Sequence, residues 1–382
     1  MRGTTFPLLL STLCHLSLAI PWSAQNQHPF APVPKSPEIT GTVTSERQDA
    51  VKEAFLFAWN GYKNYSWGAD ENRPVSNTPS NSRFITPSYI TNSKRTALRL
   101  TSVSHFLSTA TIVDSLDTLW LMGLQDDFAL ARKHVAKINW RDTRKNLVDA
   151  FETNIRYIGG LLGAYDLSGD HLFLDKAIEL ADLLLPIFDS PTGLPYQFID
   201  FSSGQPVKSG YPRGASILAE IGSFQLEFTH ISQLTGNWTY HHKAQRANDF
   251  FDGLRRTHQY PPGLFPILVD IDNGEFTTST CSRVAFFDGV SVFLFTLRKL
   301  FPAISQAQIT YGGLGDSFYE YLIKQFILSD GTNDQLHRLS LESVQSLEKY
   351  LLSSPVNRTD LVFLAQLVDG KQRNGMDELV CL

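Results

Sequence analysis

A glutamate and an arginine that share one predicted helix face are the residues in this sequence best suited to chemistry. Glu152 and Arg156 stand four positions apart, so on a helix they are neighbours and can form an ion pair. A carboxyl group beside a guanidinium can take part in proton transfer, although most pairs at this spacing are surface salt bridges. The pair alone leaves catalysis and surface stabilisation open.

The stretch 146–170, which carries this pair, predicts an amphipathic helix. Its apolar residues recur at steps of three and four, the period of a helix with one buried face. Gly159, Gly160 and Gly163 lower the helix propensity of the same stretch. We therefore expect a closely packed neighbour or a ligand to use the space that they leave.

Further acidic residues stand at predicted helices. Asp114 and Asp117 are three apart in the apolar segment 109–124, so they either hydrogen-bond to the protein or line a site. Asp316 follows the glycine-rich turn 311–315 at the start of a predicted helix, where an acidic residue is typically an N-cap.

Repeated joints organise the chain. Segments 167–170 and 234–237 each place Gly before Asp or Asn, which predicts a helix that ends at the glycine and a second helix capped by the next residue. Repeated helix hairpins of this size indicate a stacked or circular arrangement. Segments 191–206 and 261–276 predict short β-hairpin inserts. For 333–382 we expect two more helices.

Composition limits the function classes. The 382 residues are 42% hydrophobic and 12% aromatic, enough for one large core or two moderate ones. The net charge of −5, with acidic and basic residues interspersed, gives no sign of nucleic-acid binding. No obligate protein partner is indicated. Cys14 lies in the leader, and Cys281 and Cys381 either pair with each other or remain separate.

The N-terminus predicts entry into the secretory pathway. Residues 1–24 have the positive start, short apolar run and small residues of a signal peptide, with a membrane signal-anchor as the alternative. Residues 25–45 are rich in proline and polar residues and predict a linker, which leaves 46–382 as the folded domain. Glycosylation sequons at Asn64, Asn237 and Asn357 fit a secreted protein or one of the Golgi or endoplasmic-reticulum lumen.

Five segments of the sequence carry a family resemblance. They are, in chain order, AWNGYKNYSWGADENRP, IVDSLDTLWLMGL, DAFETNIRYIGGLLGAYDLSGD, SILAEIGSFQLEFTHISQLTGN and GGLGDSFYEYLIKQF. Together they resemble the class I α-1,2-mannosidases of glycoside hydrolase family 47, in particular the fungal secreted or Golgi type. The resemblance implies an all-α (αα)7 barrel of helix hairpins with short β-hairpin inserts. It also implies Ca²⁺ as cofactor and inverting hydrolysis of terminal α-1,2-linked mannose from high-mannose N-glycans.

The resemblance also assigns roles to individual residues. Glu152 matches the acid that protonates the leaving oxygen, and Asp316 matches the second catalytic carboxylate. Arg156 and Glu220 match substrate-binding residues, and Leu314 matches the leucine of members that trim several branches. An inverting glycosidase needs a protonated carboxyl and an ionised carboxylate about 6.5–9.5 Å apart, with a water between them. We expect Glu152 and Asp316 to face one cavity at the toroid axis.

The sequence departs from the family pattern in two places. Segment 376–382 has Glu378 where histidine is usual and Leu382 where phenylalanine is usual, and the family domain continues beyond this point. We therefore expect a C-terminally incomplete domain. The calcium-binding threonine of the family would lie beyond Leu382, so we expect no metal ligand in this chain. We also expect the 382-residue chain itself to have no activity. The apolar segment 281–308 is interpreted as a retained intron or mispredicted exon rather than a genuine insertion.

Two other functions compete with this reading. One is a mannose-glycan-binding relative without hydrolytic activity, a lectin of the degradation-factor type. The other is an unrelated α/α toroid enzyme. The presence of Glu152, Arg156, Glu220 and Asp316 favours the hydrolase.

Overall fold

The structure is a computed structural model, and it describes residues 46–81, 109–141, 147–211, 214–254, 260–276 and 307–381. The predicted signal peptide, the predicted linker and positions 281–306 of the apolar segment lie outside the described residues. Among the described helices, none has both the length and the apolar character needed to cross a membrane.

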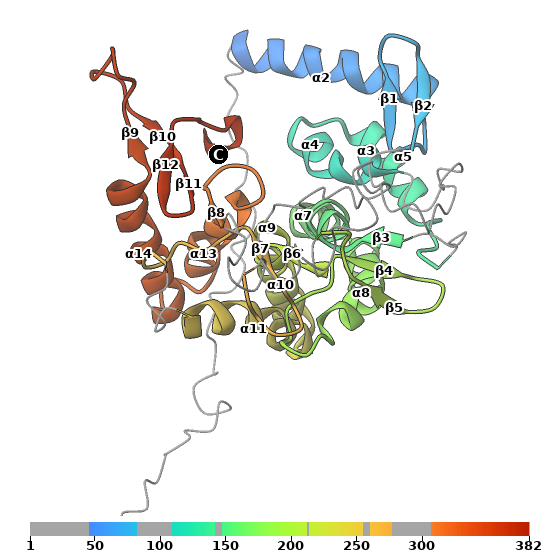
Figure 1. Ribbon diagram of the computed structural model, residues 1–382. Coiled ribbons are helices and arrows are strands. Elements are labelled where there is room, and N and C mark those ends of the chain that lie inside the picture. Colours follow the sequence, from blue (N-terminus) through green and yellow to red (C-terminus); the bar gives the residue numbers. More distant parts are fainter. Residues whose placement is uncertain are drawn as a thin grey trace, which may run out of the picture.

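Helix hairpins follow one another along the described part of the chain (Figure 1). They are α4 (Leu116–Leu121) with α5 (Gln125–Val135), α7 (Gly159–Ser168) with α8 (His171–Leu184), α10 (Gln225–Thr235) with α11 (Thr239–Leu254), and α13 (Asp316–Leu328) with α14 (Asp334–Tyr350). The first helices contact one another in the order α4, α7, α10, α13, and each second helix packs against its own first helix. We call α4, α7, α10 and α13 the inner row. The predicted repetition of helix hairpins is confirmed.

The joints within the hairpins have the predicted caps. Gly169 (φ 69°) ends α7 in the left-handed conformation, and Asp170 begins the next helix by accepting a hydrogen bond from the Leu172 N–H at 3.1 Å. Gly236 (φ 74°) ends α10 in the same way, and the side chain of Asn237 accepts from the Thr239 N–H at 3.1 Å. A left-handed residue without a Cβ costs little, which explains glycine at both positions.

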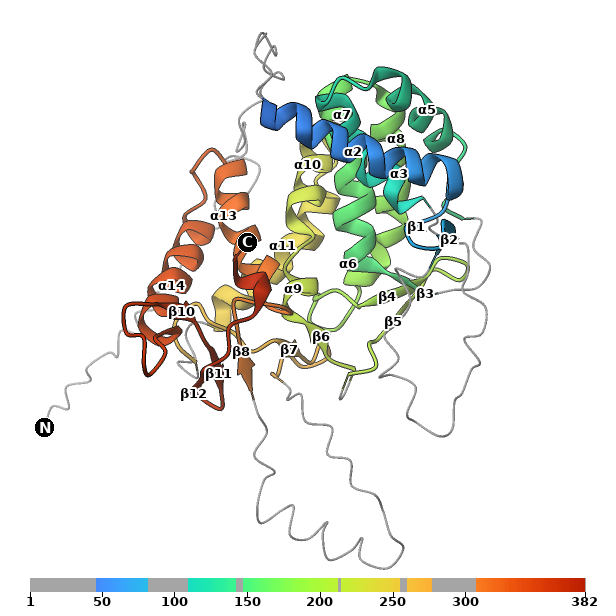
Figure 2. The same ribbon diagram turned by 90° about the horizontal axis from the view of Figure 1, so that it is seen from above.

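Further helices complete the fold. They are α2 (Glu46–Tyr65), α3 (Ala110–Asp114), α6 (Ala150–Glu152), the π-helix η2 (Thr153–Ile158), the 3₁₀ helix η3 (Leu185–Phe188), α9 (Leu218–Ile221) and the 3₁₀ helix η6 (Glu378–Cys381). Helix α2 lies along the side of the molecule that carries α3 and α5 (Figures 1 and 2). It buries Trp59 and Tyr62 in the core and leaves Phe57 87% exposed.

Antiparallel strands of two or three residues lie before, between and after the hairpins. The sheets are β1 (Glu71–Arg73) with β2 (Thr78–Ser80), β3 (Leu147–Asp149) with β4 (Phe198–Asp200) and β5 (Gln205–Val207), β6 (Ser216–Ile217) with β7 (Leu268–Val269), β8 (Gln308–Ile309) with β11 (Gln366–Val368) and β12 (Lys371–Arg373), and β9 (Leu352–Ser353) with β10 (Phe363–Leu364). Strands therefore occur in both segments, 191–206 and 261–276, for which the sequence predicts β-hairpin inserts.

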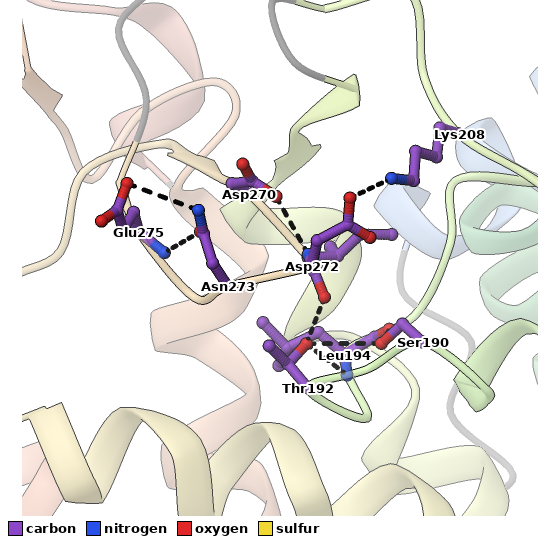
Figure 3. Close-up of polar contacts among 9 residues, drawn as sticks. Ser190, Thr192, Leu194, Lys208, Asp270, Asp272, Asn273 and Glu275 are labelled. Carbon is purple, nitrogen blue, oxygen red and sulfur yellow. Dashed lines mark hydrogen bonds and ion pairs between the residues drawn. The ribbon is translucent and has the colours of Figure 1, made fainter.

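The two inserts hold each other in place (Figure 3). Thr192 Oγ1 donates a hydrogen bond to the Ile271 carbonyl at 2.6 Å, and Lys208 forms an ion pair with Asp272. Within the second insert, the Asp272 N–H donates to Asp270 Oδ1 at 2.9 Å and closes the turn. These contacts fix the position of one insert relative to the other, at the ends of α8 and α11.

The C-terminal part differs from the expected pair of helices. After α14 the chain forms β9 to β12 and the 3₁₀ helix η6. Asp369 (φ 53°) and Gly370 (φ 71°) form the two-residue turn between β11 and β12. Asp-Gly with both φ values positive is a preferred hairpin turn, so the sequence carried a strand signal that the helix expectation overlooked.

Candidate active site

Glu152 lies on α6, where the chain passes into the π-helix η2 and then into α7 of the inner row. The side chain of Asp149 caps this start by accepting a hydrogen bond from the Glu152 N–H at 3.1 Å, and Thr153 Oγ1 donates to the Asp149 carbonyl at 2.6 Å. Isolated π-helical turns are rare and occur often at functional sites. Figure 2 shows α6 beside β3, at the end of the helix row where the strands lie.

Arg156 binds two acidic side chains. Its Nε donates to Glu152 Oε2 at 2.6 Å, which confirms the predicted ion pair, and its Nη1 lies 3.5 Å from Asp114 Oδ2. Burial alone would lower the pKa of Arg156. The negative charges and hydrogen bonds of Glu152 and Asp114 outweigh burial and hold this pKa above its ordinary value. Asp114 thus faces the site, whereas Asp117 accepts a hydrogen bond from the neighbouring Thr118 N–H.

Glu220, on α9, lies close to Glu152. Gln197 connects α6, which carries Glu152, with α9, which carries Glu220. Its backbone carbonyl accepts a hydrogen bond from the Ala150 N–H at 2.9 Å, and its side-chain Nε2 donates one to Glu220 Oε1 at 2.9 Å. Burial, followed by the charge of Asp149, raises the pKa of Glu220 well above its ordinary value. Burial also raises the pKa of Asp149, to about 7, and the charge of Glu152 adds to this rise.

Asp316 and Leu314 approach from the next hairpin. The Ala219 N–H donates to the Leu314 carbonyl at 3.0 Å, which joins the Leu314 turn to the residue before Glu220. Leu314 is left-handed (φ 74°) and 40% exposed. The contact places Leu314 beside α9, and Asp316 follows two residues later.

The N-cap interpretation of Asp316 is wrong. Gly315 occupies the N-cap of α13, and Asp316 is the first helical residue, with its Oδ1 accepting from the Ser317 N–H at 2.9 Å. Burial raises the pKa of Asp316, and the negative charge of Asp377 contributes. The carboxylate is therefore partly buried at a helix start without capping that helix.

The helix glycines near Glu152 have different roles. A Cβ on Gly160 would lie 2.8 Å from the Val113 carbonyl oxygen, closer than real contacts allow, so α3 uses the space that this glycine leaves. A Cβ on Gly163 would lie 3.9 Å from Asp117 Cβ, which is an ordinary contact. The expectation of a closely packed neighbour is confirmed for Gly160.

Several polar residues near the site were not singled out from the sequence. Asp149 stands three residues before Glu152, the spacing of an N-terminal cap, so a signal for it existed. Gln197 carries no such signal because it lies in a hairpin insert. Buried Asp70 accepts hydrogen bonds from the Ala110 N–H (3.4 Å) and the Tyr157 hydroxyl (3.3 Å), and burial raises its pKa to about 7.

The predicted glycosylation positions are accessible. Asn64 on α2, Asn237 at the start of α11 and Asn357 between β9 and β10 are all exposed. Their glycosylation stays a prediction.

The described residues offer no cluster of acidic side chains for calcium. They contain no group of three or more His, Cys, Asp or Glu side chains placed to hold one metal ion. Glu152 and Glu220 are instead engaged by Arg156 and Gln197.

Helix hairpins follow one another in a row, and carboxylates stand at or just before the starts of successive inner helices. Residues 54–382 match the profile of "Glycosyl hydrolase family 47". The chain belongs to glycosyl hydrolase family 47.

Individual relatives agree with this assignment. The chain is 33% identical to mannosyl-oligosaccharide 1,2-alpha-mannosidase IB of Mus musculus over 92% of this chain and 48% of that protein. It is 34% identical to mannosyl-oligosaccharide alpha-1,2-mannosidase IA of Spodoptera frugiperda over 94% of this chain and 46% of that protein. The solved structure of an alpha-1,2-mannosidase from Trichoderma reesei matches with a TM-score of 0.67 and 28% identity, covering 85% of this chain and 59% of that one. The chain spans about half the length of the curated relatives it matches.

Proposed function

We propose that this protein is a mannosyl-oligosaccharide 1,2-α-mannosidase that removes terminal α-1,2-linked mannose from high-mannose N-glycans with inversion. The observation that carries the proposal is the Glu152–Arg156 ion pair at a π-helical turn in a chain of family 47. Glu220 lies beside this pair, and the turn that contains Leu314 is hydrogen-bonded to α9. The names of the relatives from mouse and Spodoptera frugiperda give the linkage and the substrate class.

In the proposed reaction, the bond between the anomeric carbon and the leaving oxygen breaks as water attacks from the opposite face. Glu152 gives its proton to the leaving oxygen, and Asp316 accepts a proton from the attacking water. Burial raises the pKa of Asp316, which makes it a stronger proton acceptor. Arg156 fixes the Glu152 carboxyl, and Leu314 binds the sugar.

Further parts of the proposal follow from family membership. The inner row α4–α7–α10–α13 is part of an (αα)7 barrel, and the substrate enters at the end where the inner helices begin. Calcium belongs to the family reaction, and the described residues supply no ligand set for it. The protein acts in the secretory pathway; one relative is named as an endoplasmic reticulum enzyme.

The test is the release of mannose from a high-mannose N-glycan, with and without a chelator. It is run on the 382-residue chain and on a chimera that carries the C-terminal region of the Trichoderma reesei relative. We expect chelator-sensitive release by the chimera and its loss in Glu152→Gln. The surface variant Glu179→Gln in the chimera is the matched control for removing one carboxylate.

Other outcomes discriminate between the hypotheses. A folded chimera that binds the glycan without releasing mannose would support the lectin alternative. Release that survives Glu152→Gln would contradict the assignment of Glu152.

A further inference from the structure

Two buried oxygen atoms beside the candidate active site have no hydrogen-bond donor. Glu220 Oε1 accepts a hydrogen bond from Gln197 Nε2 at 2.9 Å, but Glu220 Oε2 and Gln197 Oε1 are both buried without a partner. Buried polar atoms are nearly always paired, and leaving one unpaired destabilises the folded state. The Glu220 carboxyl and the Gln197 amide thus share a single hydrogen bond, and two acceptor oxygens have no donor.

Water does not supply the missing donor. The cavity lined by Gln197, Glu220 and their neighbours is too small to admit a water molecule. The hydroxyl of Ser216, which also lines this cavity, donates to the Pro195 carbonyl at 3.2 Å. The donor must therefore come from the carboxyl–amide pair itself.

We propose that Glu220 is protonated and that its Oε2–H donates to Gln197 Oε1, which closes a cyclic acid–amide pair with two hydrogen bonds. A protonated carboxyl has one O–H donor, so this single proton satisfies both unpaired atoms. Gln197 is then a positioning residue that holds Glu220 neutral. The consequence of this pair for catalysis rests on the proposed function, whereas the protonation itself does not.

The neighbouring acid, Asp149, is the competing place for the proton. Its side chain accepts backbone hydrogen bonds from the N–H groups of Glu152 and Phe151, and such bonds favour the ionised carboxylate. Glu220 has a side-chain donor at one oxygen and an unpaired second oxygen. Because two adjacent buried acids do not readily ionise together, the proton belongs on Glu220.

The negatively charged groups around Glu220 act in the same direction. Burial and then the negative charges of Asp149 and Glu152 raise its pKa. Helix α13 packs against α9 through Phe318, which lies close to Gly222, and α13 begins with a further acid, Asp316. Arg156, the cation of the site, binds Glu152 and Asp114.

A neutral Glu220 changes the charge around the proposed acid. Glu152 then has one ionised acid fewer beside it, which leaves Asp149 and Arg156 as its charged neighbours. Gln197, which comes from the first hairpin insert, therefore adjusts the pH range of the enzyme without contacting the sugar. We expect Gln197→Met to shift the pH profile of kcat in the chimera.

Protonation of Glu220 is tested without any activity measurement. In the 382-residue chain at pH 7, infrared spectroscopy should show a protonated-carboxyl C=O band that is absent in Glu220→Gln. The band should move to higher frequency in Gln197→Met, because the acid loses its hydrogen-bond partner. Absence of the band in the unsubstituted chain overturns the proposal, and a band unchanged in Gln197→Met overturns the role of Gln197.

The stability of the chain gives a second, independent readout. An acid whose pKa is raised by folding weakens the folded state as pH rises above the pKa of the unfolded chain, about 4 for glutamate. The Tm of Glu220→Gln minus the Tm of the unsubstituted chain should therefore increase by about 2–4 °C for each pH unit above this value. Glu179→Gln, on the surface, leaves Glu220 in place and is the control.

The outcomes separate the two proposals. Glutamine has the same shape as a neutral glutamic acid, so failure of Glu220→Gln to fold contradicts the acid–amide pair. A Tm difference between Glu220→Gln and the unsubstituted chain that does not change with pH also contradicts it. A chimera that releases no mannose contradicts the proposed function and leaves the infrared and Tm results unaffected.

Discussion

Glu152 and Asp316, the two proposed catalytic carboxylates, are held by different means. Glu152 stands on a π-helical turn that is capped by Asp149, and it is bound by Arg156. Asp316 follows a turn with a left-handed leucine, and its described hydrogen bond is to the next residue, Ser317. We call these the clasped side and the turn side of the site.

The difference indicates how each side obtains its geometry. The clasped side is fixed by contacts between segments far apart in the sequence, such as Tyr157 with Asp70 and Gln197 with Glu220. The turn side depends on the local conformation of 311–315, joined to α9 by the Leu314 carbonyl. Substitutions on the clasped side should therefore act through packing and charge, and those on the turn side through backbone conformation.

The largest expected effect is loss of catalysis from either side. Glu152→Gln and Asp316→Asn should each lower kcat for mannose release by the chimera on the order of 10²–10⁴-fold, because each removes one member of the acid–base pair. The measurement is the initial rate together with Tm, and Glu179→Gln is the control. A rate loss in only one of the two variants would show that the two sides do not act as a pair.

Packing on the clasped side is tested at its glycines. Gly160→Ala should destabilise the chain by about 1–3 kcal/mol, because the added methyl group meets the Val113 carbonyl of α3 at 2.8 Å. Gly163→Ala has room for its methyl group and should stabilise by up to about 1 kcal/mol through helix propensity. Urea unfolding measures both, and equal effects of the two substitutions would contradict the close contact between α3 and α7.

Charge on the clasped side is tested at Asp70. Its pKa is raised to about 7, so the stability that depends on its neutral form is complete below about pH 4 and falls as pH rises towards 7, by about 1.4 kcal/mol per unit. Asp70→Asn should remove this part of the pH dependence of the unfolding free energy. Asp149 titrates in the same direction and remains in the variant, so the slope should decrease without vanishing.

The smallest effect is expected on the turn side. Leu314→Gly should stabilise the chain by about 0.5–1 kcal/mol, because glycine adopts the left-handed conformation without the Cβ clash. Leu314→Ala keeps that clash and serves as the matched control. If alanine stabilises as much as glycine, the exposed side chain rather than the backbone is the source of strain.

The sequence predicted the parts of the fold that are determined locally. The helix ends at Gly169 and Gly236 and the caps at Asp170 and Asn237 depend on neighbouring residues, and they were predicted correctly. The strands after α14 were missed although the turn at Asp369 and Gly370 carried a local signal.

The remaining features depend on contacts between distant segments. The π-helical turn after Glu152 and the pairing of Gln197 with Glu220 arise when β3, β4 and α9 come together. Hydrophobic periodicity contains no information about such pairings. For the same reason Asp316 was misinterpreted as an N-cap, because the choice between Gly315 and Asp316 is made by the turn that contacts α9.

The orientation of α10 would separate a glycan on Asn237 from the sugars that the protein is proposed to cleave. Glu220 precedes this helix and Asn237 follows it, so the 11 residues of α10 place them about 17 Å apart along its axis. A glycan on Asn237 would begin at the opposite end of the inner row from the carboxylates. The enzyme would then carry a high-mannose chain without presenting that chain to its own active site.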